Sequence, residues 1–131
     1  MGKLGISIYP EKTTEKEVID YIDKAGEAGF SRIFSCLLSV NESKEVILEK
    51  FKKINQYAKE KGFEIILDVN PKVFNDLGIS YDDLSFFKEM NADGIRLDIG
   101  FTGLQESIMT FNKENLKIEI NMSNITHYID T

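Results

Sequence analysis

Five short segments of the chain share a pattern in which aliphatic residues alternate with residues that turn polar toward the end of the segment. The pattern is clear in four segments and weaker in the second. They cover residues 5–11, 32–39, 64–70, 94–100 and 117–123. Because successive side chains of a strand point to opposite faces, each segment predicts a strand with one apolar and one polar face.

Segments with helical periodicity separate the predicted strands. The expected helices cover residues 14–28, 43–61, a segment opened by Ser80 and Asp83 that runs to about Met90, and a short stretch that begins at Thr102 or Gly103. Thr14 and Glu17 have the spacing of a capping box at the start of the first of them. Regular alternation of strands and helices predicts a parallel sheet with right-handed crossovers.

Two architectures fit five parallel strands. An open doubly wound sheet is covered by helices on both faces, so both sets of alternate residues should be apolar. Here one set becomes polar from mid-strand onward, which favours the inside of a (β/α)8 barrel near its catalytic mouth. The predicted fold class is therefore α/β, with parallel (β/α) units that form a partial barrel of about five strands.

Length and charge restrict the remaining possibilities. A complete barrel takes about 250 residues, so we expect residues 1–131 to be the N-terminal portion of one, with open sheet edges that favour self-association. A net charge of −6 argues against binding a nucleic-acid backbone, but not against a small phosphorylated ligand. The sequence shows neither a signal peptide nor a run of about 20 apolar residues for a membrane span. The single cysteine, Cys36, suits the cytoplasm and is expected to be an inert core thiol.

Several uncommon strings occur in one order along nearly the whole chain: LGISIYPEKTT, RIFSCLLSVNESKE, ILDVNPKVFNDLGISYDDLSFF, ADGIRLDIGFTGLQE and LKIEINMSN. Together they resemble the bacterial 6-phospho-N-acetylmuramidase family. The resemblance implies a (β/α)8 barrel followed by a cyclophilin-like domain, of which this chain lacks the last strands and the second domain. It also implies a cytoplasmic glycosidase of peptidoglycan recycling, which cleaves a disaccharide of 6-phospho-N-acetylmuramic acid and N-acetylglucosamine without a cofactor. This chain alone is then expected to be an incomplete, inactive fragment.

Glycoside hydrolysis generally needs two carboxyl groups. This chain has four carboxyl groups at or near the ends of predicted strands on the polar face. We expect Asp98 and Glu119, on adjacent strands, to form the catalytic pair, with Asp68 as the next candidate. Which group is the acid stays open, as does the choice between a retaining and an inverting mechanism. A structural alternative is that Arg96 and Asp98, two residues apart on one face, form an internal ion pair.

The remaining polar residues of this face are candidates for binding the sugar. These substrate-binding candidates are Tyr9, Glu11, Asn70, Arg96, Asn121 and Ser123. Hydroxyl and amide groups suit sugar hydroxyls, and Tyr9 would stack on a ring unless it fills the core. The sequence has no Cys/His cluster, so no metal site is expected.

Two other functions fit the same pattern. A non-catalytic barrel would bind the phosphosugar without turnover. A barrel lyase, epimerase or isomerase would use the carboxylates for proton transfer together with a metal or a lysine. Lys117, at the N-terminal end of the last strand, is the lysine available on the polar face, far from the expected mouth.

Overall fold

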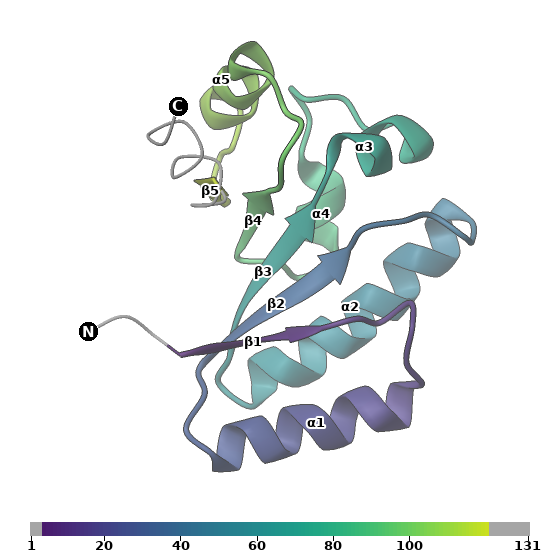
Figure 1. The fold of residues 1–131 in the computed structure, drawn as a ribbon, viewed down its shortest axis with the longest axis vertical. Helices are drawn as coiled ribbons and strands as arrows, with labels where there is room; N and C mark the ends of the chain where they lie inside the picture. The colour runs from purple at the N-terminus through teal and green to yellow at the C-terminus, as the bar shows by residue number, and fades with distance from the viewer. Residues whose placement is uncertain (1–3, 121–131) are drawn as a thin grey trace.

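The computed structural model describes residues 4–120 (Figure 1). Its strands are β1 (Gly5–Ile8), β2 (Arg32–Leu37), β3 (Glu64–Val69), β4 (Gly94–Leu97) and β5 (Lys117–Ile120). Its helices are α1 (Glu15–Glu27), α2 (Lys44–Glu60), α3 (Pro71–Leu77), α4 (Ser85–Glu89) and α5 (Gly103–Phe111). All five predicted strands are therefore present, and β1 to β4 end before the segments read from the sequence do. Residues 121–123 of the fifth segment lie outside the described residues.

The strands form one parallel sheet in the order β1-β2-β3-β4-β5. A doubly wound sheet reverses its strand order at a switch point, whereas this sheet runs in sequence order like the wall of a (β/α)8 barrel. The prediction of an α/β fold built from parallel (β/α) units is confirmed, and the sequential order is that of a partial barrel.

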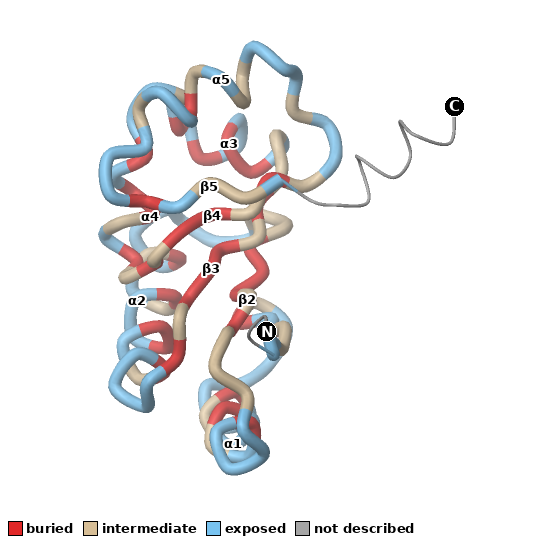
Figure 2. The backbone as a smooth tube through the Cα atoms, turned by 90° about the vertical axis from the view of Figure 1, so that its left-hand side faces the viewer, coloured by how far each residue is buried: buried red, intermediate tan, exposed pale blue. Residues whose placement is uncertain are grey.

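The hydrophobic core lies between the sheet and the helices. In one cluster, α1 and α2 pack on the strand residues Ile8, Ile33 and Ile65. In the second, the helices α2, α3, α4 and α5 pack on Leu67 and Leu97. Figure 2 shows these buried positions along the strands and on the helix sides that face them. These strand residues belong to one alternating set, so their burial leaves the other set on the opposite face of the sheet. Each fully buried aliphatic side chain contributes about 1.5–3 kcal/mol.

Side-chain caps fix where the long helices begin. Thr14 accepts a hydrogen bond from the Glu17 backbone N–H, and the Glu17 side chain accepts one from the Thr14 backbone N–H, which is a complete capping box. Ser43 caps α2 in the simpler way, and Thr102 and Gln105 form a second capping box at α5. The capping box expected at residue 14 is confirmed.

The segment after β3 differs from the prediction of a single helix opened by Ser80. The structure has a short α3 before that point and an α4 that starts only at Ser85. Asn70 caps α3, Pro71 occupies its first turn, and Gly78 ends it in the left-handed conformation with φ 68°. The Asn70–Pro71 start and the Gly78 end of this short helix are visible in the sequence.

Two further features of residues 4–120 concern membranes and metal ions. None of the helices described there is long and apolar enough to cross a membrane. The same residues contain no group of three or more His, Cys, Asp or Glu side chains arranged to hold a metal ion.

Candidate active site

A row of side chains crosses the face of the sheet opposite to the core. The strand registers place Cys36 beside Asp68, Asp68 beside Arg96, and Arg96 beside Glu119. Register partners in a parallel sheet point to the same face. The structure therefore brings two of the three predicted catalytic carboxylates into line with the predicted binding residue Arg96.

Arg96 and Asp68 form a bidentate ion pair between β4 and β3. Arg96 Nε donates to Asp68 Oδ1 at 3.1 Å, and Nη2 donates to Oδ2 at 2.7 Å. These hydrogen bonds are the main reason why the pKa of Arg96 is raised, and the charge of Asp98 adds to the effect. Asp68 is thus a hydrogen-bonded partner of Arg96, and Asp98 acts on the same guanidinium through its charge.

An aromatic ring supports this ion pair. The Arg96 guanidinium carbon lies 4.0 Å from the centroid of the Phe34 ring, and that of Arg32 lies 5.2 Å from the same ring. Both distances are within the range of cation–π attraction. Phe34 was not among the predicted site residues, although it shares the inward set of β2 with Arg32 and Cys36.

Glu119 is held by a different arginine. Arg32 Nη2 pairs with Glu119 Oε2, and Arg32 Nε lies 2.9 Å from Glu64 Oε1. Glu64 also pairs with Lys117, whose Nζ lies 2.5 Å from Glu64 Oε2. Arg32, Glu64 and Lys117 all stand at the N-terminal starts of their strands, so the Glu119 carboxylate is tied to a network on the side away from the mouth.

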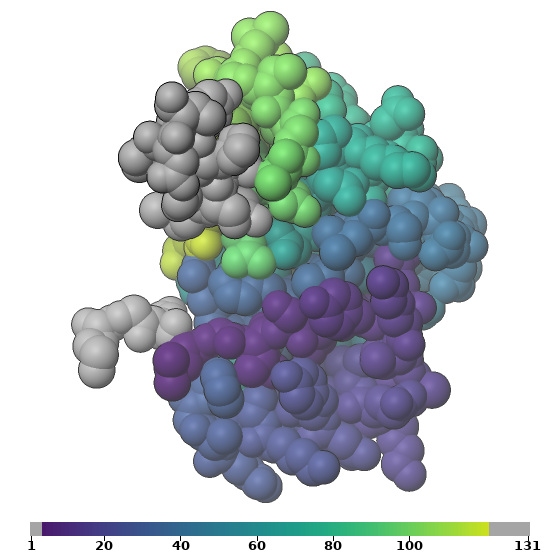
Figure 3. All heavy atoms as spheres, viewed as in Figure 1, coloured from purple at the N-terminus to yellow at the C-terminus, as the bar shows by residue number. Residues whose placement is uncertain are grey.

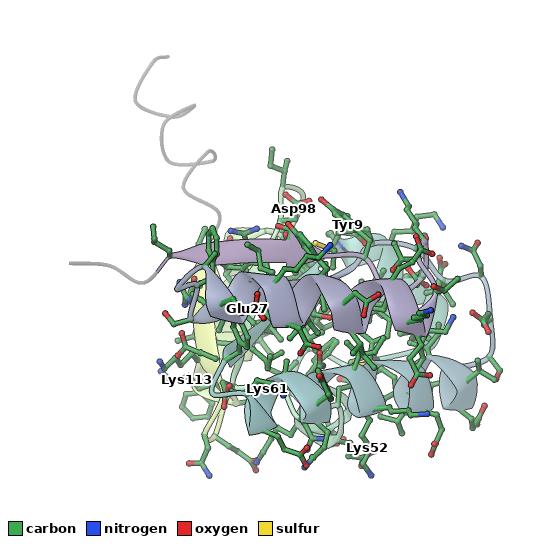
Figure 4. All side chains as sticks on the ribbon, turned by 90° about the horizontal axis from the view of Figure 1, so that it is seen from below. Tyr9, Glu27, Lys52, Lys61, Asp98 and Lys113 are labelled. Atoms are coloured by element: carbon green, nitrogen blue, oxygen red, sulfur yellow. The ribbon has the colours of Figure 1, made fainter. Side chains whose placement is uncertain are left out.

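Asp98 lies one residue beyond β4, at the mouth. Its backbone N–H donates to the Val69 carbonyl at 3.0 Å, and its Oδ1 accepts from the Ile99 N–H at 2.8 Å. Figure 4 shows Asp98 and Tyr9 on the side of the sheet away from α1 and α2. Tyr9 is 42% exposed, so it is available at the surface rather than filling the core.

A small pocket of about 150 Å³ opens at the ends of β1 and β2. It is lined by Tyr9, Glu11, Lys12, Cys36, Leu38 and Ser39. Ser39 Oγ donates to Glu11 Oε2 at 3.4 Å, while burial raises the pKa of Glu11 from its usual 4.5. Burial, helped by the charge of Asp68, raises the pKa of Cys36 to about 11, so this thiol is inert near neutral pH.

The amide of Asn70 makes hydrogen bonds within the fold. Its Oδ1 accepts from the Val73 N–H at 2.9 Å to cap α3, and its Nδ2 donates to the Leu38 carbonyl at 3.0 Å. The side chain thereby joins the ends of β2 and β3. The other two predicted amide and hydroxyl ligands, Asn121 and Ser123, lie outside the described residues.

A larger groove of about 430 Å³ lies between the start of α1 and α2. Its lining includes Thr13, Glu15, Val46, Lys53 and Ile54, on the helical layer rather than at the strand ends. The space-filling view in Figure 3 shows α1 directly beneath β1 on the side of the molecule that faces the viewer. Because active sites of parallel α/β enzymes lie at the C-terminal strand ends, the smaller pocket is the candidate site.

The model of the N-terminal domain of 6-phospho-N-acetylmuramidase matches residues 4–131. Among solved structures, an uncharacterized B. cereus protein is 51% identical, with a TM-score of 0.72 over 92% of this chain and 31% of its own. A conserved Enterococcus faecalis protein of unknown function is 19% identical, with a TM-score of 0.60 over 92% of this chain and 39% of its own.

Thiamine phosphate pyrophosphorylase from Pyrococcus furiosus is also 19% identical, with a TM-score of 0.58 over 90% of this chain and 48% of its own. At this identity the likeness concerns the fold alone. The chain spans from about a third to a half of the length of these solved structures. No curated protein matches it. The family match covers every strand and helix described above, and the chain belongs to the 6-phospho-N-acetylmuramidase family.

Proposed function

We propose that the protein carrying this chain is a cytoplasmic glycoside hydrolase of peptidoglycan recycling. Its substrate is the disaccharide of 6-phospho-N-acetylmuramic acid and N-acetylglucosamine. The observation that carries the proposal is the family match over residues 4–131, together with carboxylates on the open face of the sheet. Hydrolysis of a glycosidic bond uses two such groups.

The complete protein is proposed to contain the remaining barrel strands and a cyclophilin-like domain. Support comes from the 51% identical B. cereus structure, of which this chain covers 31%. Phe111 is 89% exposed and Ile120 is 39% exposed beside β5, where the next unit of a barrel would pack. Alone, the chain is expected to be inactive and to self-associate through its open sheet edges.

The proposed catalytic residues are Asp98, Glu119 and Asp68. Asp98 lies just beyond β4 at the mouth, and Asp68 and Glu119 lie deeper on the open face, in β3 and β5. In a barrel, side chains from several strands surround one substrate. Negative charge on this face would stabilise the oxocarbenium-like transition state of glycoside cleavage. The proposed substrate-binding residues are Tyr9, Glu11, Asn70, Arg96, Asn121 and Ser123.

The test is to incubate the full-length protein and this chain in parallel with the disaccharide and to measure release of N-acetylglucosamine. Release by the full-length protein alone would support two claims: that the full-length protein is a glycosidase, and that this chain is an incomplete, inactive part of it. In the full-length protein, Asp98→Asn and Glu119→Gln are each expected to abolish release while the thermal unfolding midpoint stays close to wild type. Full turnover by both variants would refute this assignment of the catalytic pair.

A second candidate is a barrel that binds the phosphosugar without cleaving it. The observation in its favour is that Asp68 and Glu119 each pair with an arginine, as structural carboxylates do. Such a protein would retain affinity for the disaccharide in both variants, and the wild type would release no product.

A further inference from the structure

Glu11 differs from the other acidic side chains of the mouth because it lies in a loop whose backbone is fixed by hydrogen bonds. The Lys12 N–H and the Thr13 hydroxyl both donate to the Tyr9 carbonyl, each at 2.9 Å. These bonds close the turn that follows β1 and fix the backbone on both sides of Glu11. The Ser39 hydroxyl, from the loop after β2, donates a long hydrogen bond of 3.4 Å to the carboxyl group.

The pocket beside Glu11 opens on the face of the sheet that carries Asp68 and Arg96. Two of its lining residues, Cys36 and Leu38, alternate with the core residue Leu37, and Cys36 is the register partner of Asp68. The pocket therefore lies on the open face of the sheet, at the C-terminal end of the strands. Glu11 is half-buried at its rim.

Charged groups around Glu11 largely offset one another. Lys50, from α2, stabilises the ionised carboxylate, and Glu42, from the loop before α2, opposes it. Lys50 Nζ donates to Glu42 at 2.7 Å, so the two form a pair of their own. Lys12 lines the pocket as well. Burial outweighs the Ser39 hydrogen bond and these charges, and it favours the protonated form of Glu11.

A proton donor must carry its proton until the bond breaks. Protonating Asp68 or Glu119 would forfeit an ion pair with Arg96 or Arg32, whereas Glu11 accepts its hydrogen bond from the neutral Ser39 hydroxyl. We propose that Glu11 is the general acid of the glycosidase, which protonates the oxygen that leaves with N-acetylglucosamine. This inference rests on the proposed function. It changes the role of Glu11 from binding to catalysis and assigns Glu11, rather than Glu119, as the acid that acts with Asp98.

The step balances without a co-reactant. The Glu11 carboxyl proton moves to the bridging oxygen, the bond from the anomeric carbon to that oxygen breaks, and its electron pair stays on the oxygen. One water supplies the hydroxyl group of the new anomeric centre, and its second proton restores the carboxyl group. Asp98, which lies one residue beyond β4, remains the second carboxyl group.

The experiment compares two substrates in full-length Glu11→Gln. One is the natural disaccharide, and the other is a 2,4-dinitrophenyl glycoside of 6-phospho-N-acetylmuramic acid, whose leaving group needs no proton. We expect kcat/KM for the disaccharide to fall by about 100-fold or more, and that for the aryl glycoside to stay within about fivefold. The alkaline limb of the wild-type pH profile should also be absent from the variant's profile with the aryl glycoside.

The matched control is Glu42→Gln, which removes a neighbouring carboxylate outside the pocket lining and should leave both substrates unaffected. Equal losses on the two substrates, or no loss on the disaccharide, would overturn the role of Glu11 while leaving the proposed function intact. A wild-type protein that turns over neither substrate would instead overturn the proposed function, and this inference with it.

Discussion

Arg96 donates to both carboxylate oxygens of Asp68, across adjacent strands and on the open face of the sheet. The pair is only partly exposed, since 27% of the Arg96 side chain and 13% of the Asp68 side chain remain accessible. Bidentate geometry makes this one of the stronger kinds of ion pair. It fixes the position of one proposed catalytic carboxylate before any substrate is bound.

Removing one partner should cost more than removing both. We expect Arg96→Leu in the full-length protein to lower the free energy of unfolding by about 1–3 kcal/mol, because the largely buried Asp68 carboxylate is left without its cation. Adding Asp68→Asn should recover part of that loss. A double-mutant cycle by urea unfolding measures the coupling. Additive losses would mean that the two residues contribute independently.

The aromatic ring face of Phe34 should contribute to the stability of the fold. Phe34→Leu keeps an apolar side chain but removes the cation–π contacts to Arg96 and Arg32, so we expect a loss of about 0.5–2 kcal/mol. Phe34→Tyr keeps the ring face and serves as the matched control. If Leu and Tyr variants have the same urea midpoint, the ring face contributes nothing beyond its volume.

Asn70 is expected to act mainly through the fold. Asn70→Ala removes the cap of α3 and the bond to the Leu38 carbonyl, which should cost about 1–2 kcal/mol. Asn70→Ser keeps a capping oxygen and should recover about half of the loss. A sugar-binding role would appear as a raised KM for the disaccharide in the Ser variant, at nearly normal stability.

Glu119 can be tested against its own partner. If Glu119 is catalytic, Glu119→Gln should reduce kcat by at least about 100-fold, whereas Arg32→Leu, which breaks the same ion pair, should reduce it far less. Both variants are compared at equal temperature below their unfolding midpoints. Equal reductions in kcat would indicate that the pair, rather than the carboxylate itself, is what the site requires.

The sequence predicted the strands, the long helices and the capping box because these depend on neighbours within a few residues. Alternation also placed Asp68, Arg96 and Glu119 on one face. It could not show that Arg96 pairs with Asp68, because that pair depends on the register between β3 and β4. Register is set by packing across the whole sheet.

The same limit explains Glu11. From the sequence it was a residue just past a strand, because nothing local reveals that Ser39, 28 residues later, donates a hydrogen bond to its carboxyl group. Partial burial at the rim of a pocket is likewise a property of two loops brought together by the pairing of β1 with β2. The residue type was visible in the sequence, but its environment was not.

Two glutamates should respond to pH with opposite signs. Burial raises the pKa of Glu11 above its usual value, so its contribution to stability is present below that value and is lost as the pH rises through the folded-state pKa. The Thr14 backbone N–H lowers the pKa of Glu17, so its contribution is present above the usual value and is lost as the pH falls.

The variants Glu11→Gln and Glu17→Gln in the full-length protein therefore form a matched pair. Relative to wild type, the urea midpoint of Glu11→Gln should rise between about pH 4 and pH 7. The reason is that wild type loses stability when its partly buried carboxyl group ionises, whereas the amide stays neutral. That of Glu17→Gln should fall over the same interval, because only the wild type gains a capping charge. Both measurements use one buffer series, so a general effect of pH on the fold cancels in the comparison. A Glu11→Gln midpoint that follows wild type at every pH would mean that this carboxyl group is no more buried than an ordinary surface acid, and it would remove the electrostatic support for its role as proton donor.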